Sequence, residues 1–146
     1  MNIPLALLWF LIGFLAVNSL KFSHLRRTMR KLQLNPAYTE YPEAEIMKIA
    51  YRKSLPFTPA YYLLVWIVCS TFYFLFHTSP NIYIDALSTG ILWWLLTALL
   101  EMLLWVKAGH KLRLTWKSMY MNSQPWLSLC YYAVLISPLV LAVILK

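Results

Sequence analysis

The chain has 146 residues, of which 61% are hydrophobic and 12% are charged, and its mean hydropathy is +0.60. Soluble domains carry about 25% charged and about 45–50% apolar residues, and a soluble chain this short could not bury so much apolar surface. The composition therefore excludes an ordinary water-soluble domain and predicts an integral membrane protein. The length leaves no room for a separate globular domain, so residues 1–146 are expected to form one membrane domain.

Four apolar stretches are long enough to cross about 30 Å of hydrocarbon as helices at about 1.5 Å per residue. They cover approximately residues 3–20, 57–76, 82–106 and 126–145. Each should be an α-helix, because backbone polar groups in lipid must be satisfied internally. The first stretch lacks the basic leader and the cleavage site of a signal peptide, and is read as an uncleaved span. The expected fold class is all-α, a polytopic four-transmembrane-helix bundle with amphipathic helices at the cytoplasmic interface.

Lysine and arginine are distributed unequally around these spans. The connection 21–56 holds eight of the thirteen and the connection 107–124 holds four, which leaves only Lys146 elsewhere. Cytoplasmic connections carry such an excess, so both are placed inside and both termini outside, in a plasma (inner) membrane. Topology and anionic lipid account for the net charge of +8, and no nucleic-acid partner is expected.

The first half of the connection 21–56 predicts a basic amphipathic helix that continues the first span and bends onto the inner leaflet. Asn35-Pro36 should end this helix, because the residue before a proline avoids the α region. The basic cluster could serve only to fix the topology, or it could dock a specific lipid or protein. The residues expected at lipid headgroups, in this connection and the second one, are Arg26, Arg27, Arg30, Lys31, Lys111, Arg113 and Lys117.

The second half of this connection predicts another helix, which begins near Pro42 and ends at Leu55-Pro56. Glutamates lie at its start and basic residues towards its end, an order that favours both ends of the helix dipole. The glutamates Glu40, Glu43 and Glu45 form the only acidic cluster of the chain. The segment is interpreted as a surface helix, with a contact to a partner protein as the alternative.

Glu101 is the most informative residue within the spans. An ionised carboxylate at the centre of a membrane helix costs about 2.5–3.5 kcal/mol on insertion scales, less near an end, and usually faces the bundle interior. We predict that it faces Asn18 or one of the nearby tyrosines, either as a structural hydrogen bond or to bind a proton, a cation or a headgroup. The polar groups expected at its depth, which together form the predicted intramembrane polar site, are Glu101, Thr97, Asn18, Tyr62, Ser128 and Tyr131.

The other reactive side chains give weaker signals. His77 and Asp85 flank the predicted outer turn and are placed to pair there. Cys69 and Cys130 should differ in depth by roughly 10 Å, whereas a disulfide needs Cα atoms closer than about 7 Å, so two reduced, buried thiols are expected. No metal-site spacing is present in the sequence, and neither a metal nor another cofactor is expected.

Three functions remain open on this basis. The first is a small accessory protein that associates with a larger membrane partner or with a second copy, on a bilayer with anionic headgroups. The second is a proton- or cation-coupled transporter or channel component that uses Glu101 and assembles into an oligomer, since four spans enclose little of a pathway. The third is a lipid-active enzyme at the inner leaflet, in which Glu101 and His110 move a proton. Enzymes of that kind usually have denser clusters of acidic residues or histidines than this sequence shows, so an enzyme is less favoured.

Overall fold

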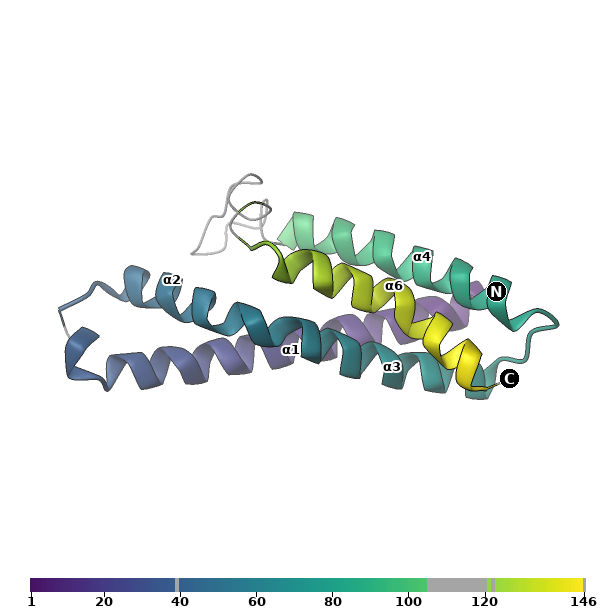
Figure 1. The fold of residues 1–146 in the computed structure, drawn as a ribbon, viewed down its shortest axis with the longest axis horizontal. Helices are drawn as coiled ribbons and strands as arrows, with labels where there is room; N and C mark the ends of the chain where they lie inside the picture. Colours follow the sequence, from purple (N-terminus) through teal and green to yellow (C-terminus); the bar gives the residue numbers. More distant parts are fainter. Residues whose placement is uncertain (39, 105–120, 122, 146) are drawn as a thin grey trace.

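The computed structural model describes residues 1–38, 40–104, 121 and 123–145. Within these residues the chain forms helices joined by short turns (Figure 1). The α-helices are α1 (Ile3–Gln33), α2 (Glu43–Ser54), α3 (Thr58–Phe76), α4 (Ile82–Met102) and α6 (Trp126–Ile144). Four helical stretches of this part are long and apolar enough to cross a membrane: α1, α2 with α3, α4 and α6.

The predicted spans agree closely with these helices. The spans predicted at 57–76 and 126–145 correspond to α3 and α6, and the span predicted at 82–106 corresponds to α4. Asparagine side chains cap the N-termini of two helices. Oδ1 of Asn2 accepts a hydrogen bond from the backbone amide of Leu5 in α1, and Oδ1 of Asn81 accepts one from the backbone amide of Ile84 in α4. The predicted interfacial residues Lys111, Arg113 and Lys117, together with His110, lie outside the described residues.

The first span differs from its prediction, because α1 runs without a break from Ile3 to Gln33 instead of bending at its basic half. Its 31 residues correspond to about 46 Å, well beyond a bilayer core of about 30 Å. The reason is that the apolar side chains of this half are covered by protein: Leu25 and Leu32 are buried against Ile46 and Ala50 of α2.

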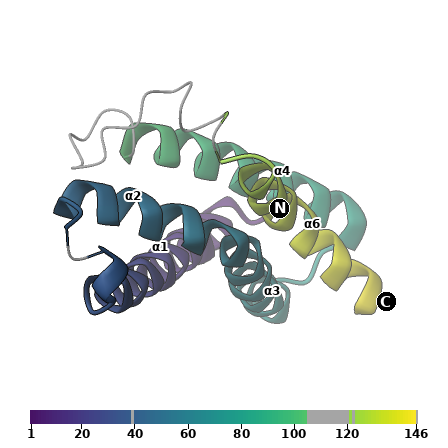
Figure 2. The ribbon, with the colours of Figure 1, turned by 60° about the vertical axis from the view of Figure 1, so that its left-hand side comes forward.

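The helix predicted to begin near Pro42 is α2, which starts at Glu43. At its other end the chain passes through one 3-10 turn, Leu55–Phe57, directly into α3, so the proline at position 56 marks a junction between two helices. The antiparallel pair formed by residues 22–54, hereafter the hairpin, projects from one end of the bundle (Figures 1 and 2). Both termini and the α3–α4 turn lie at the opposite end, hereafter the termini end (Figure 1).

Within the bundle, α6 packs against both α3 and α4, while α1 packs against α3 (Figure 2). The core is rich in large aromatic side chains, with Trp66, Trp93, Tyr62 and Tyr73 each at most 1% exposed. At Gly90 an added Cβ would collide with the backbone carbonyl of residue 135, so the absence of a side chain there lets α4 and α6 approach closely. The cysteines at positions 69 and 130 are both buried and unpaired, as predicted.

Candidate functional site

Glu101 lies in the interior at the hairpin end of α4, with 1% of its surface exposed. Its Oε1 accepts a hydrogen bond from the hydroxyl of Tyr62, one of the tyrosines expected as its partner. The same oxygen lies 2.7 Å from Nζ of Lys21, which is also 3.2 Å from the Tyr62 hydroxyl. The three side chains come from α4, α3 and α1, so the cluster joins three helices.

Lys21 was missed as a partner, because it was read as the first residue of a topology-setting basic cluster. A signal for its position does exist in the sequence. Counting from Phe10, the buried residues of α1 recur at helical spacing through Phe14 and Val17, and Lys21 continues this stripe four residues later. A lysine on the apolar stripe of a membrane helix points towards the interior, where its ammonium group needs a partner.

Of the other members of the predicted polar site, Asn18 and Ser128 make their hydrogen bonds elsewhere, whereas Tyr131 is close enough to interact electrostatically with Tyr62. Asn18 donates its side-chain amide to the carbonyl of Phe14 in its own helix. Ser128 donates to Oε1 of Gln124, and Tyr131 is half-buried on α6. Thr97, one turn before Glu101, is 0% exposed and its hydroxyl makes no hydrogen bond within the described part of the chain.

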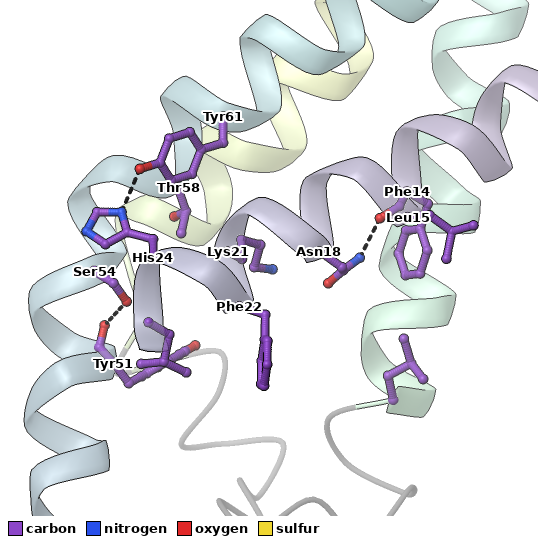
Figure 3. A pocket seen from close by; sticks show the side chains of 12 residues that line it. Phe14, Leu15, Asn18, Lys21, Phe22, His24, Tyr51, Ser54, Thr58 and Tyr61 are labelled. Carbon is purple, nitrogen blue, oxygen red and sulfur yellow. Dashed lines mark hydrogen bonds between the residues drawn. The ribbon is translucent and has the colours of Figure 1, made fainter. Parts of the chain in front are cut away.

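A cavity of ≈ 320 Å³ lies beside the Glu101 cluster, between α1, the hairpin and the end of α4 (Figure 3). Most of its lining surface is apolar, and Lys21 and Asn18 are among the polar side chains that border it. On its α1–α3 side, Nδ1 of His24 lies 2.6 Å from the hydroxyl of Tyr61 (Figure 3). Lys21 both lines the cavity and binds Glu101, so its side chain connects the cavity wall to the buried carboxylate.

A second buried carboxylate, Asp85, lies at the termini end of α4 with 2% exposure. The Tyr73 hydroxyl donates to its Oδ1 at 3.1 Å, and the amino group of Met1 lies 3.1 Å from the same oxygen. Nε2 of His77 lies 3.0 Å from Oδ2, so these residues pair as predicted, as an ion pair when the imidazole is protonated. The contribution of the chain's own amino group was not foreseen.

The two carboxylate clusters are built from the same helices. In each, α4 supplies the acid and α3 supplies a tyrosine, while the cation is Lys21 of α1 at one end and the amino group of Met1, two residues before α1, at the other. Between them, the indole Nε1 of Trp93 donates to the carbonyl of Ala6 at 2.8 Å. The backbones of α1 and α4 make few direct contacts, so these three polar bridges are the main link between the two helices that the described residues show.

The hairpin presents charged side chains to its surroundings. The predicted headgroup residues within the described part, Arg26, Arg27, Arg30 and Lys31, are all exposed on α1. A second hollow, of ≈ 440 Å³, is lined by Arg27 and Lys31 together with hydroxyl groups of neighbouring residues. The glutamates at positions 40, 43 and 45 are exposed near the tip.

These clusters hold groups that can bind a polar or charged ligand and transfer protons. Among the described residues no group of three or more His, Cys, Asp or Glu side chains could hold a metal ion. A carboxylate in contact with a tyrosine hydroxyl and an ammonium group can hold or pass on a proton. Comparison with protein-family models, with curated proteins and with solved structures gives no match.

Proposed function

We propose that the chain is a multi-pass protein of the plasma membrane with both termini outside, and that it acts as an accessory protein whose hairpin docks a larger partner on the cytoplasmic side. Four helical stretches long and apolar enough to span support the membrane location. The excess of lysine and arginine in the connections at the hairpin end supports the orientation.

The observation that carries the docking proposal is the group of exposed glutamates near the tip of the hairpin, Glu40, Glu43 and Glu45. Basic residues line the rest of the hairpin, and each one at an anionic surface contributes about 1 kcal/mol of attraction. Arg30 and Lys31 in the last turn of α1 bring exposed positive charge up to the glutamates. An anionic leaflet repels the glutamates, which favours a protein over lipid as the partner of the tip.

The tip also exposes apolar side chains. Leu34, directly after α1, is 84% exposed, and Tyr41, which follows Glu40 in the chain, is 45% exposed. An apolar patch with an acidic rim fits a protein surface with a basic rim better than it fits a lipid headgroup. The hairpin is continuous with two bundle helices, so a docked partner would be held in a fixed position relative to the membrane.

The experiment compares the triple variant Glu40→Lys, Glu43→Lys, Glu45→Lys with a control in which the same glutamates become aspartate. A photo-crosslinking amino acid is placed at Leu34, or at the 65% exposed Leu75 of α3 as the positional control. We expect a defined crosslinked partner from position 34 in the parent and aspartate chains, and at least a tenfold loss, equivalent to about 1.4 kcal/mol, in the lysine chain.

Two outcomes would contradict the proposal. Equal crosslinking from Leu34 and Leu75 would show that the product reflects proximity in the membrane and not docking at the tip. If Leu34 crosslinks only to a second copy of the chain, the tip mediates self-association and does not dock a larger partner.

A further inference from the structure

The interior of α4 carries a line of side chains that joins the two carboxylate clusters. Every fourth residue along the helix is buried, at most 2% exposed in each case: Asp85, Thr89, Trp93, Thr97 and Glu101. Residues four apart are neighbours on a helix surface, so each member lies next to the following one. From the first to the last the helix rises by about 24 Å, most of a hydrocarbon core of about 30 Å.

Several polar atoms along this line lack partners. Oγ1 of Thr97, Oε2 of Glu101 and the indole Nε1 of Trp66 are buried and make no hydrogen bond within the described residues. The ring of Trp66 packs on that of Trp93 with centroids 5.0 Å apart, which places its indole beside the middle of the line. Thr89 lies beside Tyr73, near the Asp85 end.

Unpaired buried polar groups are costly, at about 1–3 kcal/mol each. Native proteins usually satisfy them with ordered water, which both donates and accepts hydrogen bonds. Thr97 lies on the α4 face between the two carboxylates, Oε2 belongs to Glu101 at one end of the line, and the Trp66 indole approaches the middle of the line from α3. Their distribution therefore indicates a ligand that is small, polar and able to form a chain.

We propose that this line, hereafter the polar column, binds a chain of water molecules and conducts protons between Glu101 and Asp85. One ionised carboxylate takes up a proton, a proton passes along the chain to the other carboxylate, and that carboxylate then releases it on its own side, so both are ionised again at the end. Each water molecule and threonine hydroxyl between them accepts one proton and gives up one, so no net charge remains in the interior. The indole of Trp66 only donates, and its role is to hold water in place.

At each end of the polar column a partly exposed cation contacts the buried carboxylate. At the hairpin end this is Lys21, which is 18% exposed, binds Glu101 and lines the cavity of ≈ 320 Å³. At the termini end, the side chain of His77 is 21% exposed and contacts Asp85. The inference is independent of the docking proposal, because it uses none of the residues at the tip of the hairpin.

The test measures proton flux in liposomes that contain the purified full-length chain and an internal pH-sensitive dye, with a potassium diffusion potential as the driving force. We expect faster acidification than in protein-free liposomes. Thr97→Val removes the hydroxyl and keeps the shape, and should slow the flux about tenfold, equivalent to about 1.4 kcal/mol of barrier. The matched control is Thr71→Val on α3, whose hydroxyl donates to the carbonyl of Ile67 away from the polar column. It should keep the parent rate.

The proposal is overturned if the parent chain conducts no faster than protein-free liposomes, or if Thr97→Val and Thr71→Val conduct equally. Circular dichroism and gel filtration of both variants check that each is folded. Amide and indole exchange in D₂O gives a readout that does not depend on flux. The Trp66 indole should exchange faster than that of Trp93, which is bonded to Ala6; slower exchange at Trp66 would contradict a hydrated interior.

Discussion

The two buried carboxylates of α4 have the same kinds of partners, but they differ in how the positive charge is held. Glu101 is paired with Lys21, a side chain in the middle of a long helix. Asp85 is paired with the terminal amino group of Met1 and with His77, the residue that follows α3. The comparison indicates that the Lys21–Glu101 pair holds α1 against α4 where the hairpin begins. Asp85 has two cationic partners, so the loss of either one still leaves its charge paired.

The largest expected effect comes from Lys21→Met. The substitution leaves Glu101 as an unpaired buried carboxylate, and should lower the free energy of unfolding in detergent by about 3–5 kcal/mol. Titration with SDS, followed by tryptophan fluorescence, measures this change. The double variant Lys21→Met, Glu101→Gln removes both charges and should recover most of the loss. If the double variant is as unstable as the single one, the ion pair is not what holds the cluster together.

A smaller effect is expected from removing the tyrosine hydroxyls. Tyr62→Phe deletes the hydrogen bond to Glu101 and should cost about 1–3 kcal/mol of unfolding free energy, as for other buried partners of charged groups. Tyr73→Phe should cost less, because Asp85 keeps contacts to Met1 and His77. The same SDS titration compares the two variants, and a larger loss for Tyr73→Phe would reverse the proposed ranking of the clusters.

The smallest effect is expected from His77→Gln. The His77–Asp85 pair is about as buried as the Lys21–Glu101 pair, with side-chain exposures of 21% and 1% against 18% and 1%, but Asp85 keeps the hydroxyl of Tyr73 when His77 is replaced. The amino group of Met1 still faces Asp85 in this variant, so the unfolding free energy should change by less than in Tyr62→Phe. A loss as large as that of Lys21→Met would show that the termini end is the more tightly held of the two.

The positions of the long apolar helices could be predicted from the sequence because the signal is local. Length, hydropathy and proline positions determine where α3, α4 and α6 begin and end, and these limits were predicted to within a few residues. The course of α1 beyond residue 20 could not be predicted in this way. It depends on a tertiary contact, the packing of Leu25 and Leu32 on α2, which competes with the lipid surface for the same apolar stripe.

The candidate site was predicted in part, for a similar reason. Glu101 is conspicuous as an acid within an apolar span, and its depth pointed to Tyr62. The pairing of His77 with Asp85 was also predicted, but the cation at Glu101 and the tyrosine and amino group at Asp85 required knowledge of which helix faces α4. The four-residue repeat from Asp85 to Glu101 is visible in the sequence, but only burial distinguishes a polar column from a set of separate residues.

The most direct test of the account is the side of the membrane on which each end of the bundle lies. In a chain with Cys69→Ala and Cys130→Ala, a single cysteine is introduced by Tyr41→Cys at the tip of the hairpin or by Thr78→Cys in the α3–α4 turn, both exposed positions. Intact cells are then treated with a membrane-impermeant maleimide. The account predicts labelling of Thr78→Cys in intact cells and of Tyr41→Cys only after permeabilisation. Labelling of Tyr41→Cys in intact cells would contradict it.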